Sequence, residues 1–472
     1  MNKTYPLFLA GEFITTKDVL PVLDKYENIE YAHTYLADEK VLDYAIKKGL
    51  EAKEILKNLS SLEKYEILFD IHCKIKINRL HLAEILCIES AKPIKYALGE
   101  IDRAAQTFLI AAEECKRLPK EYMSLDWTNN GRNKEGIIKY FPIGLVAGIA
   151  PFNFPLNLAV HKIAPAIAAG CPIILKPAST TPLSTLELAK IISETKLPKG
   201  AISILPMTRK TGNLLVTDER IDLLSFTGSP EIGWEMKKHS GKKKIVLELG
   251  GNAGVIVTQS ANFEDVIEKS IVGAFSYSGQ ICIHAQRFFV HESVFEKFKK
   301  GIVQQAKKLN FGNPLKQDTD ISDMIDEANA IRVEDWINEA KNLGATVLCG
   351  GKRTGKFVEP TIITDTTTKM KVNWEEAFGP VICLESYSGT IENAIKKIND
   401  SKFGLQCGVF TDSIEELNTC FNEIKVGGII HNDAPTVRFD QMPYGGVKES
   451  GLGREGVKYA ILDMLEAKVL VK

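Results

Sequence analysis

One glutamate and one cysteine stand beside glycines in a way that suits covalent chemistry on a carbonyl group. Glu248 begins the run Glu-Leu-Gly-Gly, and Cys282, thirty-four positions later, ends the run Gly-Gln-Ile-Cys. A thiolate attacks carbonyl carbon, and a nearby carboxylate can serve as the base that such attack requires. The pair therefore predicts a catalytic site whose remaining parts must come from other segments of the chain.

The composition is typical of a globular protein that is too large for one core. The chain has 472 residues, of which 44% are hydrophobic and 25% are charged, and its formal net charge is −1. Two or three domains are expected at this length. Because the net charge is close to zero and lysine is interleaved with acidic residues, we expect neither a nucleic-acid partner nor a membrane-surface patch.

Targeting segments, disulfides and metals are not expected either. The N-terminus lacks the apolar core of a signal peptide, and no stretch approaches the ~20 apolar residues of a spanning helix. The nine cysteines are never spaced as C-x-x-C, and the eight histidines lack zinc-ligand spacing. These features predict a soluble, cytoplasmic protein in which only Cys282 has a polar, glycine-flanked context and the other cysteines are buried.

The elements that position this pair follow a strand-and-helix pattern. Residues 39–118 have apolar side chains three and four apart and are expected to be helical. From 144 to 229, apolar strands alternate with helices such as Pro155–Ala169, which has proline in its first turn. A second series of this kind runs from 255 to about 430. Such alternation predicts an α/β protein with parallel sheets and right-handed crossovers.

Two segments lie outside this alternation. Residues 134–142 are expected to form an exposed hairpin arm. The last residues, 467–472, read as a strand that follows a helix and has no sheet of its own chain to complete. An unpaired strand of this kind favours pairing with another subunit.

Polar groups follow several predicted strands, where parallel sheets bind ligands. Asn153 is either a helix N-cap or a donor for a developing oxyanion. Lys176 is either a surface residue that ends a strand or a group that holds a ribose hydroxyl or phosphate. The turn Thr227-Gly228-Ser229 suits a pyrophosphate near a helix N-terminus, although the G-x-G-x-x-G fingerprint of standard Rossmann binding is absent. Glu376 is either part of a helix-end charge pair or a partner for ribose hydroxyls.

The order and spacing of these motifs resemble the NAD(P)-dependent aldehyde dehydrogenase superfamily, closest to its lactaldehyde and non-phosphorylating glyceraldehyde-3-phosphate branch. The resemblance extends from about Ala10-Gly11-Glu12 to the tail and includes Met442-Pro443-Tyr444-Gly445-Gly446-Val447-Lys448 and Gly453-Arg454-Glu455-Gly456. It implies two doubly wound parallel-sheet domains plus a small β oligomerisation arm. The NAD(P)-binding domain would be 1–120 and 141–250, the catalytic domain 251–430, and the arm and tail 121–140 and 455–472, in a homodimer or homotetramer.

The resemblance also implies a role for each motif. Cys282 would attack the aldehyde to give a thiohemiacetal, which hydride transfer would convert to a thioester. Asn153 and the backbone N–H of Cys282 would hold the oxyanion, and Glu248 would activate the water that releases the acid. The implied cofactor-binding residues are Pro151, Lys176, Ala178, Ser179, Gly212, Thr227, Gly228, Ser229, Ile232, Leu249, Glu376 and Phe378.

One departure from the family pattern concerns the cofactor. Ser179 stands where many NAD-preferring members have a glutamate that would repel the 2′-phosphate of NADP. Arg209 and Lys210 either approach an adenosine phosphate or are surface charges. We therefore predict that NADP is accepted, with or without NAD.

A second departure concerns the aldehyde. One face of the helix after Asn153 would line the substrate channel, Arg438 would lie at its mouth, and Arg103 matches an anion-binding arginine. Members that use phosphate- and phosphonate-aldehydes have arginine before the nucleophile, where this chain has Ile281. His161 alone reads as a packed core histidine more readily than as a ligand. The expected substrate residues are Arg103, Phe154, Asn157, Leu158, His161, Ile281 and Arg438.

These residues predict the oxidation of a short polar aldehyde, similar to lactaldehyde or glycolaldehyde, to its acid. Oxidation of an anionic aldehyde, such as succinate semialdehyde or glyceraldehyde 3-phosphate, is the alternative. Acylation of coenzyme A is disfavoured by Glu248, which such relatives often lack. A non-catalytic structural relative is a remote alternative, because both Cys282 and Glu248 are present.

Overall fold

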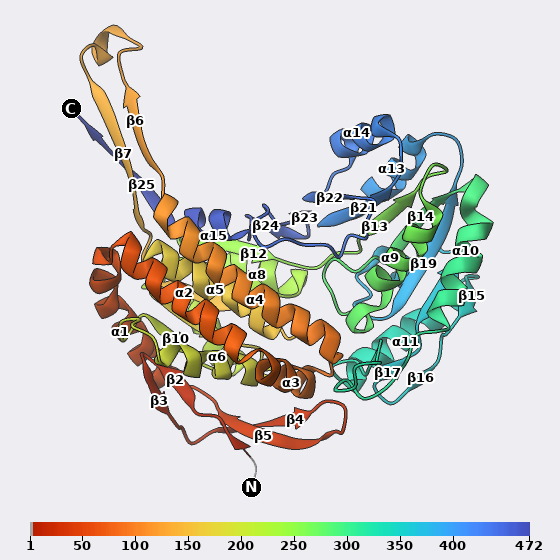
Figure 1. Ribbon diagram of the computed structural model, residues 1–472, viewed down its shortest axis with the longest axis horizontal. Helices are drawn as coiled ribbons and strands as arrows, with labels where there is room; N and C mark the ends of the chain where they lie inside the picture. The colour runs from red at the N-terminus through yellow and green to blue at the C-terminus, as the bar shows by residue number, and fades with distance from the viewer. Residues whose placement is uncertain (1–2) are drawn as a thin grey trace.

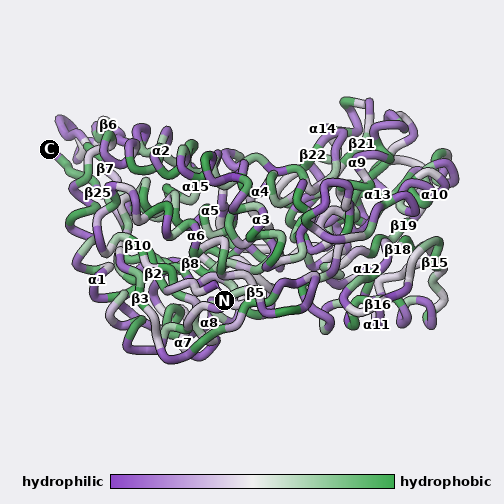
Figure 2. Tube along the Cα trace, turned by 60° about the horizontal axis from the view of Figure 1, so that its bottom comes forward, coloured by the Kyte–Doolittle hydropathy of each residue, from purple (hydrophilic) through white to green (hydrophobic). Residues whose placement is uncertain are grey.

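Two lobes and a projecting arm make up the molecule (Figure 1). The computed structural model describes residues 3–472. Each lobe is built on one large sheet, of eight strands in the first lobe and seven in the second. Figure 2 shows both lobes from another direction, with β6, β7 and β25 together at one end. The α/β fold class that the sequence predicts is confirmed.

The first sheet has a centre of five parallel strands in the spatial order β10, β9, β8, β11, β12. The chain order reverses between β8 and β11, and open α/β sheets bind ligands at such a reversal. The order is thus that of a dinucleotide-binding fold, although the usual glycine fingerprint is absent. The strands are β2 (Leu7–Leu9), β3 (Glu12–Ile14), β8 (Val146–Ile149), β9 (Ile173–Lys176), β10 (Ile202–Ile204), β11 (Leu223–Thr227), β12 (Lys244–Glu248) and β24 (Gly451–Leu452).

Helices cover both faces of this sheet. Helices α2 to α6 and α15 share one apolar core, and α1, α7 and α8 pack on the opposite face. Helices α1 to α4 occupy the region 39–118, which confirms the helical prediction there. The helices are α1 (Glu39–Asn58), α2 (Ser61–Ile77), α3 (Arg79–Ser90), α4 (Ile94–Glu114), α5 (Pro155–Ala169), α6 (Leu183–Ser193), α7 (Arg209–Thr217), α8 (Pro230–His239) and α15 (Val457–Asp463).

The second sheet has the spatial order β15, β18, β19, β14, β13, β21, β22, and every neighbouring pair except β15–β18 is parallel. The strands predicted between 255 and 430 are therefore confirmed. They are β13 (Gly254–Val257), β14 (Arg287–His291), β15 (Thr346–Cys349), β18 (Thr361–Thr364), β19 (Val381–Tyr387), β21 (Gln406–Phe410) and β22 (Gly428–His431). Around them lie α9 (Phe263–Phe275), α10 (Glu292–Ala306), α11 (Glu327–Asn342), α13 (Ile391–Asn399) and α14 (Ile414–Glu423).

The arm is an antiparallel sheet of β6 (Lys120–Ser124), β7 (Glu135–Pro142) and β25 (Leu465–Val471). The arm strand predicted at 134–142 is present. The prediction that the tail has no sheet of its own chain is wrong, because β25 pairs with β7 along its whole length. Most of the chain separates the two strands, so no local pattern reveals this pairing. Helix α15, which lies in the predicted tail, packs on α5 instead.

The N-terminal strands were not anticipated from the sequence. β1 (Lys3–Thr4), β4 (Val19–Asp24) and β5 (Ile29–Tyr35) form a small sheet, and β4 contacts α3. Their apolar runs are short, which makes them hard to separate from loops by periodicity. Within residues 3–472, no helix combines the length and apolar character that crossing a membrane requires.

Candidate active site

The carboxyl ends of β8 and β11 meet at a cavity of about 330 Å³ that reaches Cys282. Its wall contains most of the residues predicted for catalysis and cofactor binding, and the second lobe contributes a part of them. The lining residues are Pro151, Phe152, Asn153, Leu158, Thr227, Gly228, Ser229, Leu249, Gly250, Cys282, Asn329, Arg332, Glu376 and Phe378. Asn329 and Arg332 were not predicted, because they lie on α11, where the sequence shows an ordinary polar helix face.

A strained turn presents the cysteine. Tyr277 and Ser278 have left-handed backbone angles, with φ of 49° and 53°, and Gly279 follows with φ of 68°. Each non-glycine residue in this region costs about 1–3 kcal/mol. The Ser278 hydroxyl donates to the carbonyl of Ser322 at 2.6 Å, which helps to hold the turn. A Cβ on Gly279 would overlap the backbone of Gly379, so glycine is required there.

The thiol of Cys282 contacts one polar side chain directly. Its Sγ lies 3.1 Å from the phenol oxygen of Tyr444. Burial raises the pKa of Cys282 to about 11, although Tyr444 and Arg438 act to lower it. The carboxyl groups of Glu376 and Glu248 raise it further. The resting sulfur is therefore protonated at neutral pH, and the groups around it decide how easily the thiolate forms.

Asn153 points toward the cysteine turn and is not a helix N-cap. Phe154 occupies the N-cap position of α5 and makes no side-chain cap. The Asn153 amide Nδ2 donates to the carbonyl of Gln280 at 3.0 Å, which leaves its second N–H for another acceptor. The N-cap interpretation is thus wrong for Asn153. It fails because the helix begins at Pro155, two residues later.

A buried ion pair, absent from the predicted site, anchors the Asn153 segment. Lys92 and Glu100 are both almost completely buried and pair with each other. The Lys92 ammonium also donates to the backbone carbonyl of Asn153 at 2.6 Å and lies 3.7 Å from the centre of the Phe154 ring. Glu100 accepts from the first free N–H groups of α5, including that of Leu156 at 3.1 Å. The pair therefore fixes both the start of α5 and the turn before it.

Glu248 ends β12 in an enclosed position. Its side chain is buried, and neither carboxyl oxygen has a hydrogen-bond partner among residues 3–472. Burial and the neighbouring Glu455 raise the pKa of Glu248 well above its usual range. The carboxyl group is therefore protonated at low pH and becomes a base only as the pH rises. An added Cβ at Gly445 would lie 2.9 Å from Oε1, so the Gly445 backbone comes close to this group.

A buried array of charges lies behind the thiol. Lys162 donates to the Thr227 hydroxyl at 2.7 Å and to Glu455 at 3.1 Å. The other oxygen of Glu455 accepts from Arg438 at 3.0 Å, and the Arg438 guanidinium lies 3.7 Å from the centre of the Tyr444 ring. Burial acts to raise the pKa of Glu455, but Lys162 and Arg438 lower it to about 2. Glu455 is therefore the shared anion of two cations.

Asp440 connects a second part of the array. It accepts from Arg103 at 2.6 Å and lies 2.8 Å from His161 Nε2. Burial and Arg438 lower the pKa of His161, so the imidazole is neutral at pH 7. His161 is thus held in the core, as its simpler interpretation predicts. Arg438 is only 5% exposed in its side chain, so the prediction that it lies at a channel mouth is wrong.

The other predicted substrate residues lie near this array. Ile281 belongs to a small apolar cluster with Tyr277 and Tyr444, and the Phe154 ring packs edge-on against Tyr277 at 6.2 Å. Asn157 is fully buried, and no partner for its amide is found among the described residues.

The cofactor side contains groups that suit a dinucleotide. The half-buried ammonium of Lys176 has one polar contact in the described chain, the carbonyl of Pro177 at 3.5 Å, and burial and Arg209 lower its pKa. Ser229 is the N-cap residue of α8, and its side chain makes no capping hydrogen bond. Glu376 accepts from the N–H of Gly251 at 2.9 Å, and burial raises its pKa to about 7. These groups can hold a ribose, a helix-end pyrophosphate and a second ribose.

Lys176 and four other predicted cofactor residues are not in the wall of the cavity. Ala178 and Ser179 follow β9, Ile232 lies on α8, and Gly212 lies on α7. A Cβ on Gly212 would lie 3.0 Å from Lys176 Cε, so glycine lets α7 approach this lysine.

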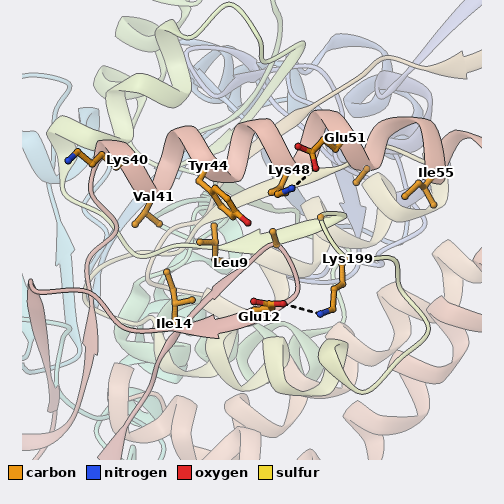
Figure 3. A pocket seen from close by; sticks show the side chains of 13 residues that line it. Leu9, Glu12, Ile14, Lys40, Val41, Tyr44, Lys48, Glu51, Ile55 and Lys199 are labelled. Atoms are coloured by element: carbon orange, nitrogen blue, oxygen red, sulfur yellow. Dashed lines mark hydrogen bonds and ion pairs between the residues drawn. The ribbon is translucent and has the colours of Figure 1, made fainter.

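A groove larger than the cavity at Cys282 lies elsewhere and contains none of the predicted site residues. It has a volume of about 660 Å³ and lies between the β2–β3 hairpin, α1 and Lys199 (Figure 3). Its charges are largely paired within the groove, Lys48 with Glu51 and Lys199 with Glu12. Within the described residues, no group of three or more potential metal ligands gathers there or elsewhere.

Comparisons with known proteins agree on one family. The model of the aldehyde dehydrogenase family matches residues 13–470. The chain belongs to the aldehyde dehydrogenase family. The family resemblance inferred from the motifs is therefore confirmed.

Similar proteins and structures point to the same part of the family. The chain is 40% identical to the 3-sulfolactaldehyde dehydrogenase of Priestia aryabhattai and 39% identical to the lactaldehyde dehydrogenase of Methanococcus aeolicus, over 99% and 98% of this chain and 98% and 99% of those proteins. Aldehyde dehydrogenase 21 of Physcomitrella patens, solved with the reaction product succinate, has a TM-score of 0.98 and 44% identity over 100% of this chain and 98% of that one.

A further solved structure bears on the cofactor. Glyceraldehyde-3-phosphate dehydrogenase GapN of Methanocaldococcus jannaschii, complexed with NADP, has a TM-score of 0.92 and 36% identity, and the match covers 97% of this chain and 100% of that one. Other similar structures hold NAD+. The present protein is thus an oxidoreductase that uses NAD or NADP.

Substitutions in the Lys92–Glu100 pair can separate two effects. One is the anchoring of the Asn153 turn, and the other is the cost of leaving a buried charge unpaired. The Lys92→Met substitution should lower the free energy of unfolding by about 3–5 kcal/mol, because it leaves Glu100 buried and unpaired. It should also lower kcat by about tenfold or more, because the Asn153 turn loses its anchor. Chemical denaturation and steady-state assays measure the two effects.

The double variant Lys92→Met with Glu100→Gln is the matched control. It removes the uncompensated charge and should recover part of the stability while kcat stays low. Full activity in both variants would contradict the anchoring role.

Proposed function

We propose that this enzyme oxidises a short aldehyde bearing an anionic group to the corresponding acid, through a covalent adduct on Cys282. The charge balance of the buried array carries this proposal. Arg103, Arg438 and Lys162 supply three positive charges, while Asp440 and Glu455 supply two negative ones. Burial lowers the pKa of His161 and raises that of Glu248, which disfavours the charged form of both side chains. A substrate anion beside this array would balance the remaining charge.

In the first step, the Cys282 thiolate attacks the aldehyde carbon and forms a thiohemiacetal. The negative charge that develops on oxygen is held by the second N–H of the Asn153 amide and by the backbone N–H of Cys282. Loss of one such donor typically lowers the rate a hundred- to thousandfold, about 3–4 kcal/mol. The Gln280 contact at 3.0 Å keeps the amide of Asn153 oriented before the substrate arrives.

Bound NAD or NADP supplies the hydride acceptor for the second step, which leaves a thioester on Cys282. Glu248 then takes a proton from water, and the resulting hydroxide attacks the thioester, releases the acid and restores the sulfur. Because the pKa of Glu248 is raised, its base form increases as pH rises through that pKa. Hydrolysis should accelerate over the same interval.

The similar proteins support a small anionic substrate. A 3-sulfolactaldehyde dehydrogenase is 40% identical, and a structure that holds succinate is 44% identical. Both names involve a three- or four-carbon unit with an anionic end. Ile281 in place of an arginine beside the nucleophile argues against a phosphorylated substrate.

An uncharged hydroxyaldehyde is the second candidate. The buried side-chain amide of Asn157 has no hydrogen-bond partner among residues 3–472, and in this second candidate it pairs with a substrate hydroxyl. The lactaldehyde dehydrogenase of Methanococcus aeolicus, at 39% identity, favours the same class. The two candidates differ in whether Arg103 is needed.

Replacement of Arg103 separates the candidates. The Arg103→Gln variant should lose about ten- to a hundredfold in kcat/KM for sulfolactaldehyde or succinate semialdehyde, because a charge-assisted contact is removed. Its kcat/KM for lactaldehyde should change less than about threefold by the same reasoning. A panel of aldehydes with one fixed cofactor measures the ratio.

Arg79 offers a matched control, since it forms a similar two-point pair with Asp102 on the exposed surface. Arg79→Gln should leave both values unchanged. Equal losses on charged and uncharged aldehydes in Arg103→Gln would contradict the anionic substrate.

We also propose that NADP is accepted. Lys176 lacks a carboxylate partner in the described chain, Arg209 lies close enough to lower its pKa, and Ser179 adds no negative charge. This concentration of positive charge suits a 2′-phosphate. Lys210 is occupied differently, because it pairs with Glu39 at 3.2 Å on the surface.

The two basic residues provide a test and its control. Arg209→Ala should lower kcat/KM for NADP by about tenfold and leave that for NAD nearly unchanged, since only NADP has the extra phosphate. Lys210→Ala should affect neither cofactor. A similar loss with both cofactors in Arg209→Ala would argue against a phosphate contact.

We propose further that the arm mediates a homodimer or homotetramer. Among residues 3–472, no strand pairs with the outer edge of β6 or of β25, and Val469, Leu470 and Trp127 are more than half exposed. Sedimentation of the full chain should give a dimer or tetramer, and Leu470→Lys should shift it toward smaller species. A monomeric wild-type protein would rule this proposal out.

A further inference from the structure

The phenol of Tyr444 is the one side-chain hydroxyl that contacts the sulfur of Cys282 among residues 3–472. The two atoms lie 3.1 Å apart, and Tyr444 is only 2% exposed. Burial and the adjacent thiol raise the pKa of Tyr444 well above its usual value, so its oxygen keeps its proton. Once the sulfur becomes a thiolate, only the phenol can donate in this contact.

Two contacts fix the orientation of this phenol. Arg438 stacks on the Tyr444 ring at 3.7 Å and is held by Glu455 at 3.0 Å. The backbone N–H of Glu455 in turn donates to the carbonyl of Tyr444 at 2.6 Å. The three residues therefore form a closed unit. A cation over the ring draws electron density from the phenol and strengthens its O–H as a donor.

We propose that Tyr444 is a catalytic residue that donates a hydrogen bond to the sulfur of Cys282 and stabilises its thiolate, with Arg438 as the positioning residue. On ionisation the thiol proton passes to water, and the phenol proton stays on oxygen. No bond to carbon forms or breaks in this step. The inference rests on the proposed role of Cys282 as nucleophile.

Other charged groups also shift the pKa of Cys282. Arg438 favours the thiolate, whereas Glu376 and Glu248 oppose it. The alternative is that Tyr444 only fills the apolar cluster around Cys282, which includes Ile281 and Met442. A phenylalanine would then serve equally well, because it keeps the ring and the Arg438 contact.

The Tyr444→Phe variant distinguishes these possibilities. Alkylation of Cys282 by iodoacetamide should be followed by peptide mass spectrometry across neutral and alkaline pH. If the phenol donates to the thiolate, the midpoint of the alkylation profile should rise by about one pH unit, equal to a tenfold loss of thiolate. NADP binding, measured by fluorescence, should be unchanged. An unshifted midpoint would overturn the proposal.

Two further variants guard against indirect effects. Replacement of Tyr444 by 3,5-difluorotyrosine strengthens the donor without changing its shape, so the midpoint should fall; a constant midpoint would count against the proposal. Tyr387→Phe, in the core of the second lobe, is the matched control and should leave the profile unchanged. A shift as large as that of Tyr444→Phe would show that the effect is not local.

Activity of the alkylated enzyme tests the underlying role of Cys282 separately. Stoichiometric alkylation of Cys282 should abolish NAD(P)H production, and Cys282→Ser should do the same. If activity survives either change, the nucleophile assignment fails, whatever Tyr444→Phe does to the pH profile.

Discussion

The ion pairs of the buried Glu455 carboxylate are the interaction on which the region around Cys282 depends. The carboxylate binds Lys162 from α5 and Arg438 from the segment after β22, and both cations are buried with it. Removing one partner from such an array leaves an uncompensated charge, which costs about 3–5 kcal/mol. Lys162 also reaches Thr227 at the end of β11, so the same array ties the sheet to the thiol region.

A second buried ion pair, Lys92 with Glu100, supports the segment that carries Asn153. It fixes the start of α5, the carbonyl of Asn153 and the ring of Phe154. The strained turn at Tyr277 is held in place by surrounding contacts. Rigid supports of this kind would keep the proposed oxyanion donor, Asn153, and the proposed nucleophile, Cys282, aligned before a substrate binds.

The sequence indicates residues that lie at strand ends, because parallel sheets bind ligands there; Asn153, Gly228 and Ser229 line the cavity as expected. The residues that hold these strand-end groups in position cannot be predicted in this way. Lys92 contacts Asn153 and Asp440 contacts Arg103 across long stretches of the chain, and a buried lysine resembles a surface one until packing is known. The β25–β7 pairing was missed for the same reason. Arg438 was located wrongly, since only the fold places it beneath the Tyr444 ring.

Covalent catalysis at Cys282 is tested most directly by trapping the acyl group. A Glu248→Gln variant should be mixed with NADP and a saturating aldehyde, quenched in acid and digested, and the Cys282 peptide should be weighed by mass spectrometry. Because the variant cannot activate water, the peptide should carry the mass of the acyl group, together with about one equivalent of reduced cofactor per site. Reduced cofactor without any adduct on Cys282 would contradict a thioester route.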